Sequence, residues 1–271
     1  MITWNDMTDD CTTVSPEMAA HIRATLDSVA REEGVRILFA AESGSRAWGF
    51  ASPDSDYDVR FIYVHSRDWY LSLVEDRDVI ERPLDSRLVD LAGWDLRKAL
   101  RLFLKSNPAF YEWLTSPVVY FDDGAFATAA RSLFERYADL DVLAHAYHSI
   151  ASGQLGGRAD PDVKLKRYFY AIRPLLALQW IEQRQSLPPM NLEQLMGGLR
   201  LAGDVSDAIL DLLNRKQATP ELGRGPRIAI LETWIADSLA AHDPAGRSNV
   251  RIPQSGALED ANALFASTAR L

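Results

Sequence analysis

Residues 44–59 read GSRAWGFASPDSDYDV, and this stretch decides which fold the rest of the sequence must complete. Asp56 and Asp58 stand at the start of an apolar run, YDVRFIYV, which predicts a strand over 57–64. Residues two apart on a strand point to the same face, so the two carboxylates project together. Two carboxylates about 4 Å apart repel by roughly 4 kcal/mol at an effective dielectric near 20. A bound cation is the simplest compensation.

The aspartates of this stretch have two competing interpretations. In a polar turn, Asp and Ser side chains cap and bend the backbone, and we assign that role to Asp54 and Ser55. Asp56 and Asp58 instead flank Tyr57 and lead into the strand, which favours a metal site. Carboxylate oxygens suit Mg²⁺ or Mn²⁺, which leave coordination positions open for substrate phosphates.

A third carboxylate would complete a two-metal site, and Asp90 is the candidate. It lies in LVDLA, an apolar and strand-like context in which an uncompensated charge is expensive. Asp85 has the surroundings of a turn residue. Asp95 is expected in the first turn of a helix, where the helix dipole favours an acid. We therefore predict Asp56, Asp58 and Asp90 as metal ligands and catalytic residues.

Hydrophobic periodicity divides the chain into two halves. The first half alternates helical and strand-like segments, beginning with a helix that has Ser15 as its cap and Pro16 at its first position. From residue 122 onward, apolar residues recur at helical spacing, with Pro174 expected to kink or break one helix near Arg173. We predict an α+β fold, with a mixed sheet domain over 1–121 and an α-helical domain over 122–271. The elements predicted in the first half are a helix over 16–34, strands over 35–42, 57–64, 78–82 and 87–92, and a helix over 94–106.

Composition limits the possible functions. A formal net charge of −9 argues against a surface that binds long nucleic acids non-specifically. This net charge is still compatible with a small basic pocket. A single cysteine, Cys11, excludes an internal disulfide, and the first residues do not resemble a secretion signal. No apolar run approaches the roughly 18 residues of a membrane span. We expect a cytoplasmic protein without a membrane partner, and nothing in the sequence indicates its oligomeric state.

Several residues have the chemistry to bind a nucleotide. Gly44 allows close approach to a ligand, and Ser45 offers a hydroxyl and a backbone N–H suited to phosphate. Arg46 either contacts the same phosphates or is a solvated turn residue. A cation beside an aromatic ring suits a triphosphate and its base, and such pairs occur in VKLKRYFYAIRP. The further candidates for nucleotide binding are Lys98, Lys164, Tyr168 and Arg173.

A basic ridge is predicted on the helix over 94–106. Arg97, Arg101 and Lys105 recur every fourth residue, and like charges at this spacing cost a few tenths of a kcal/mol per pair. Contact with RNA phosphates would offset that cost. The alternative, equally compatible with the sequence, is that these three side chains form a solvated helix face and contact no RNA.

Gly44-Ser45, the D-x-D pair Asp56 and Asp58, and the later Asp90 together resemble the signature of the DNA polymerase β-like nucleotidyltransferase superfamily. The stretches GSRAWGFASPDSDYDVRFIY, DLAGWDLRKALRLFLKSNPAFYEWLTSPVVY and KRYFYAIRPLLALQWI look like the YcgL/RlaP-type nucleotidyltransferases, a family associated with RNA repair. This resemblance covers most of residues 44–180. It implies an NTP-binding mixed sheet with a C-terminal helical domain, and it places Ser45 against the triphosphate.

The function that the resemblance implies is a metal-dependent transfer of a nucleotide from an NTP, such as ATP, to an acceptor hydroxyl. Family association alone favours an RNA acceptor. The expected partners are an NTP and a tRNA-like RNA end, in RNA repair. Protein side chains and small molecules are competing acceptors, because members of one superfamily differ in substrate. A different class of function is a non-catalytic nucleotide sensor, or a toxin–antitoxin-type enzyme that acts on protein.

Overall fold

The computed structural model describes residues 14–74, 76–155, 162–218, 223–242 and 253–270. These residues form two compact units, each discontinuous in sequence. The sheet unit comprises the described residues of Thr13–Ala47, Asp56–Ala138 and Arg251–Leu271. The helical unit comprises those of Trp48–Ser55 and Asp139–Val250.

These units divide the chain at other places than the predicted boundary between residues 121 and 122. The helix α6 (Phe126–Tyr137) belongs to the sheet unit, because it packs against strand β1 (Arg36–Glu42) and helix α12 (Ala257–Ala269). The segment Trp48–Ser55 belongs to the helical unit, because Phe50 stacks on Phe169 with ring centroids 4.7 Å apart. Hydrophobic periodicity identifies helices but does not tell which core each helix joins.

The sheet unit is built on five strands in the order β3-β4-β2-β1-β5. Strands β2 and β4 are parallel, and every other neighbouring pair is antiparallel. The predicted α+β class with a mixed sheet is confirmed. The strands of this sheet, besides β1, are β2 (Tyr57–Val64), β3 (Val79–Arg82), β4 (Val89–Asp95) and β5 (Val119–Asp122).

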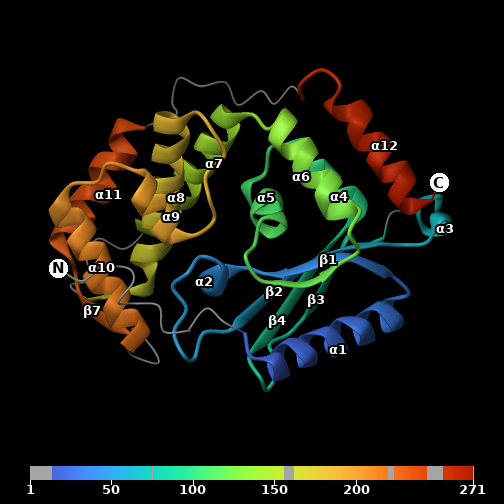
Figure 1. Ribbon diagram of the computed structural model, residues 1–271, viewed down its shortest axis with the longest axis horizontal. Coiled ribbons are helices and arrows are strands. Elements are labelled where there is room, and N and C mark those ends of the chain that lie inside the picture. The colour runs from blue at the N-terminus through green and yellow to red at the C-terminus, as the bar shows by residue number, and fades with distance from the viewer. Residues whose placement is uncertain (1–13, 75, 156–161, 219–222, 243–252, 271) are drawn as a thin grey trace. The chain divides into compact units, whose positions relative to one another are not determined.

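Helix α1 (Pro16–Glu33) lies along one face of the sheet (Figure 1). Ser15 caps its first turn, because its hydroxyl accepts a hydrogen bond from the Met18 N–H, and Gly34 ends it in the left-handed region. Its apolar stripe packs on Val59, Phe61 and other residues of that face of the sheet. Because strand side chains alternate, Asp58 and Arg60 project to the opposite face.

The opposite face of the sheet is covered by α4 (Leu96–Phe103), α5 (Pro108–Leu114) and α6 (Figure 1). Trp94 of β4 stacks on Trp113 of α5 with ring centroids 3.6 Å apart. The short helices α2 (Gly44–Ala47) and α3 (Arg67–Tyr70) complete the unit. Within the described ranges, no helix of either unit is long and apolar enough to span a bilayer.

Strand β4 and helix α4 have other boundaries than predicted. Strand β4 continues through Gly93 to Asp95, because it pairs with β2 as far as Tyr63 opposite Asp95. Asp95 is therefore the N-cap of α4 rather than a residue of its first turn, and its Oδ1 accepts a hydrogen bond from the Arg97 N–H at 2.7 Å. Helix α4 ends at Phe103, so Lys105 lies in the turn that follows.

Gly93 is required because the ring of Phe61 fills the space beside it. A Cβ at Gly93 would lie 2.2 Å from the Phe61 ring, which is fully buried. We expect Gly93→Ala to lower the free energy of unfolding by about 1–3 kcal/mol through overpacking. Urea unfolding of Gly93→Ala, Phe61→Leu and the double variant measures this effect. The double variant should lose less than the sum of the two single losses, and strict additivity would contradict the contact.

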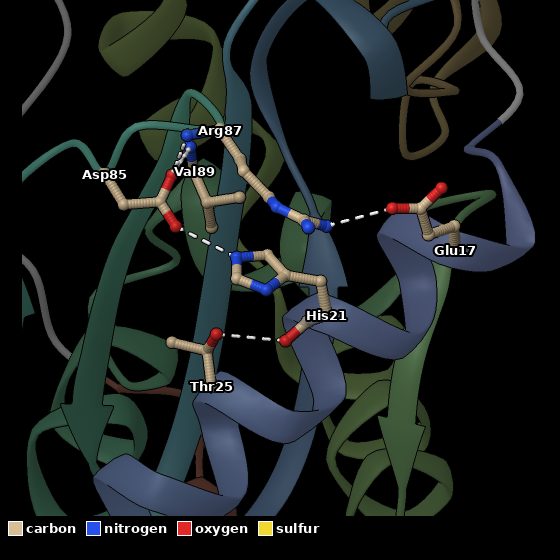
Figure 2. Close-up of polar contacts among 6 residues, drawn as sticks. All are labelled: Glu17, His21, Thr25, Asp85, Arg87 and Val89. Carbon is tan, nitrogen blue, oxygen red and sulfur yellow. Dashed lines mark hydrogen bonds and ion pairs between the residues drawn. The ribbon is translucent and has the colours of Figure 1, made fainter.

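Figure 2 shows how the turn before β4 is fastened to α1. His21 Nε2 lies 3.0 Å from Asp85 Oδ2, and Arg87 pairs with Glu17 at 3.3 Å. The other oxygen of Asp85 accepts hydrogen bonds from the N–H groups of Arg87 and Val89, at 2.7 and 2.9 Å. Asp85 is thus a turn residue, as predicted, and these contacts position the first residues of β4.

The helical unit consists mainly of helices, as predicted for the second half of the chain. Helix α8 (Lys166–Arg184) runs through Pro174, so the proline does not break it. Buried neighbours on both sides of Pro174, such as Ile172 and Leu175, hold the helix together despite the missing hydrogen bond. The other elements of this unit are α7 (Leu140–Ser152), η2 (Gly153–Leu155), β6 (Asp162–Lys164), α9 (Leu192–Gly198), α10 (Gly203–Ala218), β7 (Arg224–Pro226) and α11 (Ala229–Ala241).

Candidate active site

The candidate site lies at one edge of the sheet, where β2 and β4 begin and β1 ends. The parallel register places Asp58 of β2 opposite Asp90 of β4, so both side chains project from the same face. The antiparallel register brings Glu42, at the end of β1, opposite Val59. Helix α2 begins at Gly44, directly after β1. The Gly-Ser turn and two of the three predicted aspartates are therefore at the same edge.

Arg60 bridges these two aspartates. Its Nη2 donates to Asp58 Oδ1 at 2.9 Å and to Asp90 Oδ2 at 2.8 Å. Its Nη1 donates to the backbone carbonyls of Val59 and Asp90 at 3.1 and 3.2 Å. The side chain of Arg60 is 19% exposed, against 30% for Asp58 and 39% for Asp90. The guanidinium thus supplies a positive charge between two partly accessible carboxylates.

Asp56 contributes charge to this edge from a more exposed position. It precedes β2 and makes no hydrogen bond or ion pair within the described part of the chain, yet its charge raises the pKa of Asp58. Burial raises that pKa first of all, Asp90 raises it as well, and the guanidiniums of Arg60 and Arg46 oppose the rise. Mutual repulsion of the three acids is therefore present, as predicted from the D-x-D spacing.

Glu42 is a buried acid at the end of β1, opposite Val59 of β2. Its side chain is fully buried, and its Oε1 accepts a hydrogen bond from the Asp58 N–H at 2.8 Å. The hydroxyl of Tyr120 donates to its other oxygen. Burial raises the pKa of Glu42 from 4.5 to about 7, despite these hydrogen bonds. The carboxyl group of Glu42 connects β1 and β5 to the backbone of β2 at Asp58.

The raised pKa of Glu42 predicts a pH dependence of stability in the metal-free protein. The folded state holds this proton more tightly than the unfolded state, so its stabilising contribution is complete below pH 4.5 and is lost as the pH rises to about 7. The loss should amount to about 3 kcal/mol. Glu42→Gln has no titrating proton; its amide oxygen can still accept from the Asp58 N–H, and its NH2 group can donate to the Tyr120 oxygen. Urea unfolding in EDTA from pH 4.5 to 8 should show a difference between the two proteins that changes by this amount, and parallel curves would contradict the assignment.

Gly44 is a glycine because the Asp58 carboxylate lies against it. Its φ is 57°, and a Cβ there would lie 2.0 Å from Asp58 Oδ2. The Ser43 N–H also donates to the Asp58 carbonyl at 2.8 Å. The backbone of the Gly-Ser turn is thus held against the strand that carries Asp58, with Ser45 in the same short helix.

Arg46 is not a solvated turn residue, which was one of its two predicted roles. Its side chain is buried, and its guanidinium lies 4.0 Å from the centre of the Tyr57 ring. Its charge also lowers the pKa of Asp58 and of Glu42. Arg46 therefore contributes positive potential to the site.

Lys98 lies away from the carboxylate edge. Asp90 is near the start of β4, and Lys98 follows the end of that strand, so about 17 Å of extended chain separates Asp90 from Asp95 alone. Its ammonium pairs with Asp78 at 3.0 Å. The sheet unit does not bring Lys98 together with Asp58 and Asp90, and nucleotide binding by Lys98 stays a prediction.

The basic ridge is also different from the prediction. Arg97 packs over the Tyr70 ring at 4.9 Å and donates to the Tyr70 carbonyl, which makes it a packing residue. Arg101 is on α4, but Lys105 lies beyond the end of the helix. The ridge of three residues on one helix is therefore not present. RNA contact by Arg101 or Lys105 stays a prediction.

Lys164, Tyr168 and Arg173 belong to the helical unit, in which they have different surroundings. Lys164 is exposed in β6, whereas Tyr168 is buried in α8, so they are not one helical turn apart as predicted. The Tyr168 hydroxyl donates to Glu232 and accepts from the Ile228 N–H. Arg173 is buried, donates to the Met190 carbonyl and lies over the Trp48 ring at 4.8 Å. Nucleotide contact by these residues stays a prediction.

A pocket within the helical unit is lined by Lys164 and Tyr168, together with Arg167 and Arg227. Its volume is about 30 Å³, room for a water molecule or two. Ligand pockets for small molecules are usually on the order of 300–1,000 Å³. As it stands, this pocket does not accommodate a nucleotide.

Sequence reasoning missed Arg60 and Glu42. Arg60 stands two residues after Asp58, so strand alternation alone places both side chains on the same face of the sheet. The sequence could therefore have indicated Arg60 as a partner of Asp58. Glu42 ends the apolar run predicted as the first strand, but the sequence does not indicate which residues pair with this acid. Its partners Tyr120 and Asp58 are distant in the chain.

The types of side chain at this edge fit a hard divalent cation, although they are not arranged as a finished metal site. Asp58 and Asp90 supply carboxylate oxygens on one face, and Gly44 leaves no side chain beside Asp58 Oδ2. Arg60 takes one oxygen of each aspartate. Over the described ranges, no three His, Cys, Asp or Glu side chains are grouped closely enough to hold a metal ion. A cation would have to compete with the guanidinium of Arg60.

A mixed sheet with paired aspartates at the edge next to a Gly-Ser turn is the arrangement expected of a polymerase β-like nucleotidyltransferase. The family described as "RlaP: RNA repair pathway DNA polymerase beta family" matches residues 18–267, and the chain belongs to this family. The predicted family and class are thereby confirmed.

A curated relative and a solved structure are among the proteins similar to this chain. The uncharacterized protein YcgL of Bacillus subtilis strain 168 is 43% identical over 221 residues, which cover 80% of this chain and 84% of YcgL. A crystal structure of a nucleotidyltransferase-like protein from Exiguobacterium sibiricum 255-15 matches 91% of this chain and 89% of its own, with a TM-score of 0.33 and 11% identity. The structural likeness is too distant to support an argument.

Proposed function

We propose that this protein is a metal-dependent nucleotidyltransferase that transfers a nucleotide from an NTP to an acceptor hydroxyl. The observation that carries the proposal is the register that sets Asp58 opposite Asp90 at the edge beside the Gly44-Ser45 turn. Membership of the polymerase β-like family supports the same class of reaction. Asp56, as the acid that precedes β2, completes the set of candidate ligands.

In the proposed site, Asp58 and Asp90 hold Mg²⁺ or Mn²⁺, with Asp56 as the third candidate ligand. When bound, the cation supplies Lewis acidity toward the phosphates and the acceptor oxygen. The acceptor hydroxyl gives up its proton to solvent water as its oxygen bonds to the α-phosphorus. The bond from that phosphorus to the bridging oxygen of the β-phosphate breaks, and pyrophosphate leaves.

The other residues at this edge bind and orient the nucleotide in the proposal. Gly44 lets the backbone of α2 lie directly against the Asp58 carboxylate, so that a phosphate bound to the N-terminal turn of α2 would be next to the proposed cation. Arg46 adds a buried positive charge that favours an anionic ligand. We assign Ser45 and Arg46 to the triphosphate.

RNA is the proposed acceptor, because the description of the family refers to an RNA repair pathway. The net charge of −9 favours an acceptor that contacts the protein over a small area, such as a tRNA-like end, over a long duplex. An RNA end also supplies the hydroxyl that the reaction consumes.

The experiment is an incubation of the protein with each α-³²P-labelled NTP, Mg²⁺ or Mn²⁺, and total RNA. Label in RNA that requires the cation and is lost in Asp90→Asn supports the proposal. Label on the protein itself would show that the acceptor is a protein side chain and not RNA. Nucleotide binding without transfer in either cation would contradict catalysis and favour a nucleotide sensor.

A further inference from the structure

Arg60 occupies the position between the two aspartates that the proposed cation needs. One nitrogen, Nη2, makes both ion pairs, at 2.9 Å to Asp58 and 2.8 Å to Asp90. The guanidinium is also held in place through Nη1, which donates to two carbonyls of the neighbouring strands. Four hydrogen bonds therefore fix a positive charge in the gap between the carboxylates.

A divalent cation and this guanidinium compete for the same two carboxylate oxygens, Asp58 Oδ1 and Asp90 Oδ2. Magnesium and manganese approach carboxylate oxygens to roughly 2.0–2.2 Å, and the oxygens that face the gap already accept hydrogen bonds from Arg60. Two positive groups at such separation repel strongly in a partly buried site. A cation that takes the place of Arg60 between these two oxygens therefore requires the guanidinium to leave at least one of them.

We propose that Arg60 is an internal counter-ion of the resting protein, which keeps the affinity for free divalent cation low. The proposal rests on the proposed function, because it takes Asp58 and Asp90 as the cation ligands. A nucleoside triphosphate that arrives with the cation offers the displaced guanidinium new anionic partners, since arginine pairs well with phosphate. Arg60 then couples binding of the cation to binding of the nucleotide, as a positioning residue.

The test compares Mn²⁺ binding to the full-length wild-type protein and to Arg60→Gln, by electron paramagnetic resonance of free Mn²⁺. Arg60→Gln should bind Mn²⁺ at least tenfold more tightly, because a competing positive charge is gone. A triphosphate analogue should raise the affinity of the wild type for Mn²⁺ by a larger factor than that of Arg60→Gln, since only the wild type has a guanidinium to relocate. The double variant Asp58→Asn with Arg60→Gln should lose the gain in affinity.

Arg82 provides a matched control, because it also bridges two carboxylates of the sheet unit. It pairs with Glu32 at 3.0 Å and Glu33 at 2.6 Å, both of α1, on the face of the sheet opposite to Asp58 and Asp90. Arg82→Gln should leave the affinity for Mn²⁺ unchanged. Circular dichroism confirms folding, and Arg60→Lys is the second variant if Arg60→Gln does not fold. Because an ammonium cannot maintain four hydrogen bonds in this geometry, Arg60→Lys should have an intermediate affinity.

Equal affinities of wild type and Arg60 variants would overturn the proposal, as would an equal gain in Arg82→Gln or no binding of Mn²⁺ to any of them. Failure of the proposed function is visible separately. If the affinities for Mn²⁺ follow these expectations but the protein transfers no nucleotide, the counter-ion proposal for Arg60 holds and the proposed function is wrong.

Discussion

Replacing Asp58 by Asn is expected to reduce nucleotide transfer by about 10³-fold or more, because it removes a charged ligand for the cation at the centre of the site. The protein should remain folded. Repulsion with Asp56 and Asp90 is relieved, and this gain offsets the loss of one ion pair with Arg60. We expect the free energy of unfolding to change by about 1 kcal/mol or less. Single-turnover transfer from labelled NTP and urea unfolding measure the two quantities.

Asp54→Asn is the matched control for this variant. Asp54 is exposed in the turn four residues before Asp58, and the sequence assigns it a turn role. It should retain transfer within about twofold of the wild type. Transfer by Asp58→Asn at a similar level would show that the carboxylate takes no part in the reaction.

Gly44→Ala is the second substitution with a large expected effect. The left-handed backbone costs alanine about 1–2 kcal/mol, and the clash with Asp58 Oδ2 adds a further 1–3 kcal/mol or displaces the carboxylate. Displacement of a reacting group by about 1 Å can cost about 10²-fold in rate. We therefore expect a loss of stability and a loss of transfer by that factor.

Gly34→Ala separates the two causes. Gly34 has a φ of 64°, close to the 57° of Gly44, but a Cβ there meets nothing within 4 Å. Gly34→Ala should show only the backbone cost of about 1–2 kcal/mol and normal transfer. If Gly44→Ala matches Gly34→Ala in stability and activity, the close approach of Gly44 to Asp58 has no functional consequence.

Much of the sheet unit could be predicted because its signals are local. The Ser15 cap and Gly34 delimit α1, and continuous apolar runs delimit β1 and β2. The end of β4 could not be predicted in this way. Local sequence rules place Gly93 between a strand and the helix that follows. Pairing with β2 and contact with the Phe61 ring instead keep Gly93 in the strand. Tertiary pairing overrode local preference there.

Strand alternation and apolar context predicted the acids of the candidate site but not the residue that pairs with them. Alternation placed Asp56 and Asp58 on one face, and the apolar context of Asp90 indicated a compensated charge. Which side chain compensates them depends on the parallel pairing of β2 with β4, which a single sequence does not show. The sequence suggested a metal, and the structure places Arg60 there.

The remaining candidates were chosen from helical spacing, which is sensitive to where a helix begins. Helix α8 starts at Lys166 and leaves Lys164 outside it, and α4 ends before Lys105. Tyr168 and Arg173 are buried with polar partners of their own. Patterns of cations and rings identify possible ligand contacts, but burial decides which of these side chains are available.

The most direct test of the proposed catalytic centre is a crystal structure with Mn²⁺ and a non-hydrolysable NTP analogue, read from the anomalous signal of manganese. The proposal predicts a manganese ion within about 2.2 Å of oxygens of both Asp58 and Asp90, with the triphosphate beside Ser45. Arg60 should have moved away from at least one of the two aspartates. Manganese bound elsewhere, or a bound nucleotide with Arg60 still bridging Asp58 and Asp90, would contradict it.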